Sequence, residues 1–238
     1  MKTGKQIYLS QARANISNTR PIIFWDTCAL LDILRLPIRQ TIRGAEMLVR
    51  YEIIAESIER GIITSVTSSL VITELTNHYN QVYNELTKKE NDAKNQMIQL
   101  ADYMVSTKKK TRLIYAVNLL NIESRLLSVL HRLLKNTIIL KEQNVYRNFA
   151  DYRLRYNMAP AERKAEYKDC YIWGTFVTLI RNINPNTLSL FFTTNTKDYK
   201  DNTDNIYPQL VRDCYFPDMK IQFNVDQLYG ELHQTLGI

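Results

Sequence analysis

The sequence predicts an α/β fold, a three-layer sandwich with a short central parallel sheet and a helical hairpin insertion. Short β-rich runs alternate with longer segments whose apolar residues recur at helical spacing. This order is typical of parallel strands joined by right-handed crossovers. The 238 residues, 45% of them hydrophobic, are enough for one sizeable core. We therefore expect a single domain over residues 1–238, with the insertion at about 79–135.

The first half of the chain shows the alternation of strand and helix most clearly. The apolar run after Pro21 suits a strand that is buried on both faces. A helical pattern of apolar residues then ends at Gly61, a common helix stop. The expected elements are a polar arm over 1–20, a strand over 22–25, a helix over 41–60, a strand over 62–66 and a helix from Ser68 or Ser69 to His78.

The second half continues the pattern after a long helical stretch. Two apolar stripes at helical spacing, separated by the polar residues 107–111, predict the helical hairpin. The β-rich and amphipathic runs that follow return to alternating strands and helices. The expected elements are the hairpin over 79–135, a strand over 137–140, a helix over 145–155, a helix from about Lys168 to before Asn182, a strand over 188–193 and a candidate fifth strand over 220–223.

Composition and charge narrow the class of protein. The three cysteines, Cys28, Cys170 and Cys214, are an odd number at wide spacing, which suggests neither a disulfide framework nor a Cys-x-x-Cys metal site. The first residues lack the apolar run of a signal peptide, and no stretch approaches the roughly 18 apolar residues of a membrane span. We therefore expect a cytoplasmic protein without membrane contact. The net charge of +7 makes an anionic partner plausible.

Four carboxylates occur where an α/β sheet binds ligands. Asp26 directly follows the first predicted strand, and Asp198 lies in the loop after the fourth. Glu74 and Asp169 are placed in apolar helical segments, where carboxylates are unusual. Taken singly, three of them have an ordinary structural explanation: an ion pair for Glu74, a helix N-terminus for Asp169 and a turn for Asp198. Together they indicate a bound cation, because clustered carboxylates repel one another, and all-oxygen ligands favour Mg²⁺ or Mn²⁺.

Such a cluster suits hydrolysis of a phosphodiester bond. A hard cation can polarise a phosphoryl oxygen and lower the pKa of a bound water, so that no protein nucleophile is required. The sequence contains no Gly-x-Ser-x-Gly elbow, His-Glu-x-x-His motif, phosphate-binding loop or dinucleotide fingerprint. The three histidines, His78, His131 and His233, are dispersed, and we interpret them as structural or surface residues.

Four segments resemble the PIN-like family of metal-dependent ribonucleases, in particular its larger, insertion-bearing branch. The first contains Asp-Thr between apolar residues, with Cys28 in place of the family's usual Asn. The second pairs a strand with a glutamate-bearing helix, the third has the form Lys-Asp-x-x-Ile-Trp, and the fourth follows the pattern Thr-x-Asn-x-x-Asp-aromatic. These segments are 24–31, 64–75, 168–173 and 192–199. They are in the family's order, and the resemblance covers roughly residues 21–80 and 137–224.

The resemblance implies a role for six residues. It implies that four acids bind one or two Mg²⁺ or Mn²⁺ ions and carry catalysis, while two neighbours support them. The catalytic and metal-binding residues are Asp26, Glu74, Asp169 and Asp198, and the supporting residues are Thr193 and Asn195. Cys28 either tunes the site or is a small buried thiol, and we favour the second interpretation.

The positive charge is concentrated in one region. Residues 105–168 contain 14 Lys or Arg against 5 Asp or Glu. Cations hold phosphates and aromatic rings stack on unpaired bases, which favours single-stranded or looped RNA as the substrate. The alternative is a solvated helix face with aromatic residues packed beneath it. Lys168, beside Asp169, is expected near a bound phosphate, and Arg163 and Lys164 are further candidates.

The resulting hypothesis is a metal-dependent endoribonuclease, compatible with a toxin-like or defence role. One alternative is a catalytically inactive PIN-like module that binds RNA or acts as a scaffold; the presence of all four acids argues against it. Another is a phosphatase with Asp26 as nucleophile, but that class normally has a second Asp two positions later, where Cys28 stands. The sequence leaves open whether the chain forms a homo-oligomer or binds an inhibitory protein partner.

Overall fold

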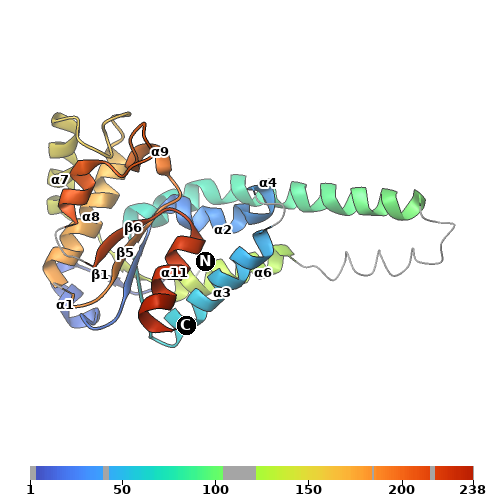
Figure 1. Ribbon diagram of the computed structural model, residues 1–238, viewed down its shortest axis with the longest axis horizontal. Helices are drawn as coiled ribbons and strands as arrows, with labels where there is room; N and C mark the ends of the chain where they lie inside the picture. Colours follow the sequence, from blue (N-terminus) through green and yellow to red (C-terminus); the bar gives the residue numbers. More distant parts are fainter. Residues whose placement is uncertain (1–3, 40–42, 104–121, 184, 215–217, 238) are drawn as a thin grey trace.

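Six parallel strands form one sheet at the centre of the computed structural model (Figure 1), which describes residues 4–39, 43–103, 122–183, 185–214 and 218–237. The strand order is β1-β4-β3-β2-β5-β6, and every neighbouring pair is parallel. The strands are β1 (Gln6–Ile7), β2 (Ile22–Trp25), β3 (Thr64–Ser68), β4 (Ile138–Leu140), β5 (Ser189–Phe192) and β6 (Met219–Gln222). The carboxyl ends of parallel strands share one edge, and β2 lies between β3 and β5 near the middle of that edge.

Helices connect the strands and cover both faces of the sheet (Figure 1). Within the described ranges these are the short η1 (Leu9–Gln11), α1 (Ala12–Asn15), α2 (Thr27–Arg39), α3 (Gly44–Glu59), α4 (Ser69–Tyr103), α6 (Ile122–Asn136), α7 (Asn144–Arg155), α8 (Tyr167–Ile183), α9 (Thr196–Tyr199), α10 (Pro208–Asp213) and α11 (Val225–Leu236). None of the helices in the described part of the chain combines the length and the apolar character needed to cross a membrane.

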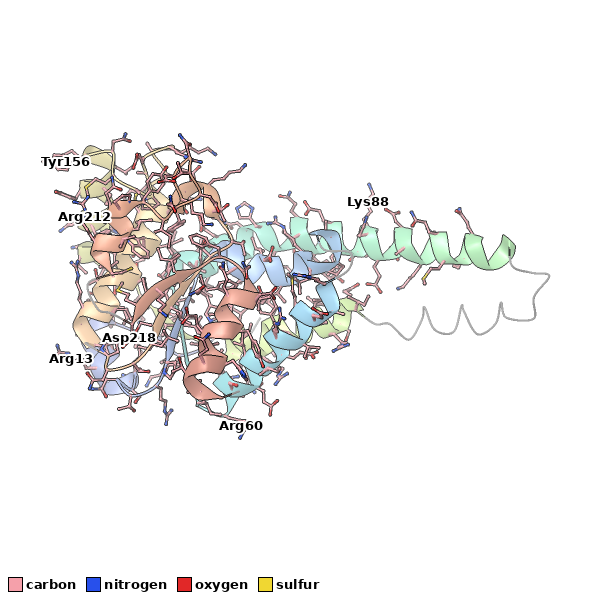
Figure 2. All side chains as sticks on the ribbon, in the orientation of Figure 1. Arg13, Arg60, Lys88, Tyr156, Arg212 and Asp218 are labelled. Atoms are coloured by element: carbon pink, nitrogen blue, oxygen red, sulfur yellow. The ribbon has the colours of Figure 1, made fainter. Side chains whose placement is uncertain are left out.

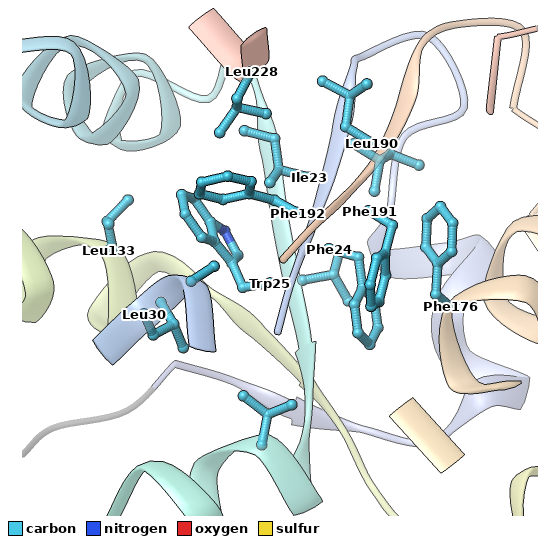
Figure 3. Packing of buried hydrophobic residues seen from close by; sticks show 14 of the residues in the cluster. Ile23, Phe24, Trp25, Leu30, Leu133, Phe176, Leu190, Phe191, Phe192 and Leu228 are labelled. Atoms are coloured by element: carbon cyan, nitrogen blue, oxygen red, sulfur yellow. The ribbon is translucent and has the colours of Figure 1, made fainter. Parts of the chain in front are cut away.

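Aromatic side chains of the central strands separate the two halves of the core (Figure 3). Successive residues of a strand point to opposite faces. Phe24 therefore packs against Phe176 of α8, with ring centroids 5.6 Å apart. On the other face Trp25 meets Phe192 at 5.4 Å, and Phe192 in turn meets a tyrosine of α3. The expected three-layer α/β sandwich around a short parallel sheet is confirmed.

Helices α7 and α8 pack unusually closely. A Cβ atom added at Gly174 of α8 would lie 2.5 Å from Cδ1 of Phe149 on α7, so only glycine allows this approach. The close contact joins α7 to the helix whose first turn contains Asp169.

Helix α4 is a single element of 35 residues that begins at the carboxyl end of β3 and projects from the body (Figure 1). The sequence predicted a helix to His78 followed by a separate hairpin, whereas the helix continues without a break to Tyr103. Helix α6, the next described helix, buries Leu126, Leu130 and Leu134 in the core. The expected turn at 107–111 lies outside the described residues, and the boundary of the insertion stays a prediction.

Several further elements differ from the sequence prediction, which included neither the short helices η1, α1, α9 and α10 nor the C-terminal helix α11. The arm over 1–20 contains β1, which pairs with β4, because Ile7 is buried although its neighbours are polar. Helix α2, directly after Asp26, was not predicted. Strand β3 begins and ends two residues later than the apolar run 62–66, because its inner positions are filled by hydroxyl residues, such as Thr67 and Ser68. The remaining strands agree with the prediction within one or two residues.

Candidate active site

Asp26 is the first polar side chain after the fully buried strand β2 and is itself only 2% exposed. Its Oδ1 accepts a hydrogen bond of 2.7 Å from the backbone N–H of Thr27, and its Oδ2 accepts one of 2.6 Å from Oγ1 of Thr193. Burial raises the pKa of Asp26 to about 6, against these two hydrogen bonds, and the charge of Glu74 adds to the rise. The bond from Thr193 ties the carboxyl ends of β2 and β5 together.

Glu74 lies in the second turn of α4 and reaches the same edge of the sheet. Its Oε2 accepts a hydrogen bond of 2.8 Å from Oγ1 of Thr27, and its Oε1 pairs with Nζ of Lys168 at 3.0 Å. The pKa of Lys168 is raised, chiefly by this hydrogen bond and by the charge of Glu74. The ion pair was one of the ordinary explanations for Glu74, and it also brings a cation from α8 to the acidic cluster.

Asp169 occupies the first turn of α8 and is 9% exposed. Its Oδ2 is buried and has no hydrogen-bond partner among the described residues. Burial raises the pKa of Asp169 to about 8, and the charges of Asp26 and Asp198 raise it further. A buried carboxyl oxygen that the surrounding chain leaves unsatisfied normally indicates a missing water, proton or ion.

Asp198 is held by the residues that connect β5 to α9. The side-chain amide of Asn195 donates a hydrogen bond of 2.6 Å to Oδ2 of Asp198. The backbone N–H of Asn195 donates one of 3.0 Å to Oγ1 of Thr193, which in turn binds Asp26. Thr193 and Asn195 thus each donate a hydrogen bond to one of the four acids, and their support of catalysis stays a prediction.

The arrangement as it stands is not a closed set of metal ligands. Among the described residues, no three His, Cys, Asp or Glu side chains are grouped so that they could hold one metal ion together. Three of the four acids instead accept hydrogen bonds from the chain. The oxygen donors and the unsatisfied Asp169 still fit Mg²⁺ or Mn²⁺, because Mg²⁺ is usually bound through one or two carboxylates and retains several waters.

The three predicted substrate-binding residues differ in their position. Lys168 contacts the acidic cluster directly through Glu74. Arg163 and Lys164 lie on the exposed loop between α7 and α8, where Arg163 donates a hydrogen bond of 2.6 Å to Oδ1 of Asn202. Their binding of substrate stays a prediction.

Sequence reasoning assigned no role to Thr27 and Tyr199. The backbone N–H of Thr27 binds Asp26 and its hydroxyl binds Glu74, so Thr27 links two acids. Its position next to Asp26 in the sequence is the signal from which this role could have been predicted. Tyr199 is fully buried, and its hydroxyl has no hydrogen-bond partner within the described ranges. Burial, Asp169 and Asp26 raise the pKa of Tyr199 far above its ordinary value. No sequence signal distinguishes its hydroxyl from that of an ordinary core tyrosine.

Cys28 is a half-buried free thiol beside the acids. Burial, together with the charges of Asp26 and Asp169, raises the pKa of Cys28 far above its ordinary value. Cys28 is therefore a neutral thiol near neutral pH, which agrees with the interpretation as a small buried side chain.

Comparison with known proteins identifies the family. A family model for the PIN domain matches residues 23–199, which contain the four acids, Thr193 and Asn195. Comparisons with curated proteins and with solved structures find no match. The family match covers most of the chain, and the parallel sheet with acids at its carboxyl edge agrees with it. The chain is therefore a member of the PIN-domain family, whose members are typically metal-dependent nucleases.

Proposed function

We propose that this protein is an endoribonuclease that requires Mg²⁺ or Mn²⁺, with its active site at Asp26, Glu74, Asp169 and Asp198. The observation that supports the proposal most directly is Asp169. It is a buried carboxyl group with one unsatisfied oxygen and a pKa raised to about 8 by burial and by neighbouring acids. The core does not require such a group, since an apolar side chain could fill the same space without this cost.

In this proposal, some residues of the site orient the acids and another attracts the substrate. Thr193 and Thr27 orient Asp26 and Glu74, and Asn195 orients Asp198. Lys168 is placed to attract a phosphate of the substrate, although this requires it to leave Glu74. A bound divalent cation would supply Lewis-acid polarisation of the phosphate and a water of lowered pKa. Three free cysteines suit a reducing compartment, so we place this activity in the cytoplasm.

A second candidate function is an RNA-binding module without nuclease activity. It is favoured by one observation: the described acids do not form a ready group of three metal ligands, and Glu74 is already paired with Lys168. In this case the acids would be held permanently by Thr27, Asn195 and Lys168, and no cation would be needed.

The decisive experiment is cleavage of a labelled single-stranded RNA by the purified full chain with Mg²⁺, with Mn²⁺ and with EDTA. We expect cleavage with a metal ion and none with EDTA. Asp26→Asn and Asp169→Asn should each lower the cleavage rate at least about a hundredfold. Each removes a charged ligand of the cation, and the cation would stabilise the transition state by several kcal/mol.

Asp204→Asn is the matched control, because Asp204 is an exposed loop carboxylate paired with Lys200. Asn is also well suited to its positive φ of 63°. This variant should cleave at the wild-type rate. Undiminished cleavage by Asp26→Asn or Asp169→Asn would exclude the proposed site, whereas RNA binding without cleavage under every metal condition would support the inactive module.

A further inference from the structure

Two tyrosines on one face of α7 are unusually exposed. Tyr152 is 57% exposed and Tyr156, the residue that caps the helix, is 59% exposed. They lie four residues apart, so they share a face, and their ring centroids are 4.7 Å apart. Because the ring planes are inclined by 50°, the rings do not cover each other, and both retain area open to solvent.

The other aromatic residues of the same helix have a different environment. Tyr146 is fully buried, and Phe149 packs against Gly174 of α8. The guanidinium of Arg153 lies 5.0 Å from the centre of the Phe149 ring and is itself buried. The structure thus gives α7 a packed side and an exposed side, and of the tyrosines in α7 and its C-terminal cap, only Tyr152 and Tyr156 are exposed.

The exposed side has a positive surrounding. Arg155 lies between the two tyrosines in sequence and is exposed, and Arg163 follows on the loop after α7. In the part of the chain that the structure describes, no carboxylate forms an ion pair with Arg155. Arg163 donates a hydrogen bond to Asn202 and its charge helps to lower the pKa of Asp201. The one carboxylate within α7 is Asp151. An exposed cation such as Arg155 beside exposed rings complements a polyanion whose bases are accessible.

Hydrogen bonds hold the end of α7, which carries the tyrosine pair, against neighbouring helices. Arg153 donates hydrogen bonds to the backbone carbonyl of Ala159 and to the carboxylate of Asp213, and Nε1 of Trp173 donates one of 2.7 Å to the same carboxylate. These bonds fix the end of α7 to α8 and α10. Figure 2 shows Tyr156 projecting from the outer surface at the upper edge of the molecule, the edge at which Figure 1 places α9.

We propose that Tyr152 and Tyr156, together with Arg155, form a platform on which unpaired bases of an RNA strand stack. The proposal rests on the RNA substrate proposed above and adds a place where the strand is held and a preference for unpaired over duplex RNA. Stacking needs an accessible face on each base, which a duplex does not offer. From the platform the loop 157–166 leads to Lys168, which contacts the acidic cluster.

Binding is measured without cleavage, by fluorescence anisotropy in EDTA, with a labelled single-stranded RNA of about 12 nucleotides. Replacing both rings in Tyr152→Leu/Tyr156→Leu should weaken binding by on the order of 10- to 100-fold. Tyr152→Phe/Tyr156→Phe keeps the rings and should bind within about threefold of the wild type. Arg155→Ala should weaken binding and lower the slope of log affinity against log salt by about 1.

A second tyrosine pair provides the matched control. Tyr79 and Tyr83 also lie four residues apart, with ring centroids 5.9 Å apart, but they are half-buried on α4, and the hydroxyl of Tyr83 binds the carboxylate of Glu123. Tyr79→Leu/Tyr83→Leu should leave the RNA affinity unchanged. Thermal unfolding of each variant shows that it is folded before its affinity is compared.

The outcomes separate the platform from the nuclease. Stacking at Tyr152 and Tyr156 is refuted if the leucine variant of the platform binds single-stranded RNA as tightly as the wild type. It is also refuted if the leucine substitutions weaken binding of an RNA duplex of equal length by the same factor as binding of the single strand. Neither result bears on metal-dependent cleavage by the wild type. If the leucine variant loses affinity and the wild type cleaves nothing, the platform stands and the nuclease is refuted. Absence of RNA binding by the wild type overturns the platform.

Discussion

Replacing Asp169 by Asn should make the metal-free protein more stable, by an amount that depends on pH. The pKa of Asp169 is raised from its ordinary 3.8 to about 8 in the folded state. Between these values the folded state holds a proton that the unfolded chain has released, so the stability of the wild type falls as pH rises. Each pH unit in this window costs about 1.4 kcal/mol, or about 3 kcal/mol between pH 5 and pH 7.

Asn has the shape of protonated Asp and does not titrate, so the variant avoids this loss. The free energy of unfolding, measured by urea denaturation in EDTA at several pH values, should therefore favour Asp169→Asn by about 3 kcal/mol more at pH 7 than at pH 5. The exposed control Asp204→Asn should show a difference from wild type within about 0.5 kcal/mol at both pH values. If the difference in free energy of unfolding between Asp169→Asn and wild type were constant across this pH range, the raised pKa of Asp169 would be refuted.

Two further predictions test the support of the site and the packing beside it. Thr193→Val should lower the free energy of unfolding by roughly 1.5–3 kcal/mol in urea denaturation, because Oδ2 of the buried Asp26 loses its donor; a loss below about 0.5 kcal/mol would show that the bond is dispensable. Gly174→Ala should cost about 1–3 kcal/mol because its Cβ would collide with Phe149. Gly230→Ala, in the middle of α11 with nothing within 4 Å of the added Cβ, should instead stabilise by about 0.5–1 kcal/mol, and equal effects of the two alanines would contradict the packing.

The positions of Asp26 and Asp198 could be predicted because they follow from strand direction. Asp26 ends a strand whose four residues are all buried, and parallel strands place such ends at one edge. What the sequence could not show is how the carboxyl oxygens are used. The bonds from Thr27 to Glu74 and from Asn195 to Asp198 depend on rotamers and on the approach of separate helices, which no local pattern encodes.

Strand β1 was missed because its local signal is weak. Strand β1 has two residues and one buried side chain, so its existence depends on pairing with β4 rather than on its own composition. In the basic segment, Tyr146 and Tyr156 are equivalent by composition, although one is fully buried and the other is 59% exposed. Only the close approach of α7 to α8 at Gly174 decides which side of the helix is covered.

Helix α4 connects the acidic cluster to a distant point of the molecule. A straight helix rises about 1.5 Å per residue, so Glu74 near its base lies roughly 44 Å from its end at Tyr103. The displacement caused by a tilt grows with distance from the base of the helix. A tilt of about 5° at the base would move the far end by roughly 4 Å while shifting Glu74 by well under about 1 Å. A change in tilt of this size would therefore leave Glu74 close to Thr27 and Lys168 at the carboxyl edge of the sheet, while the far end of α4 is displaced several times further.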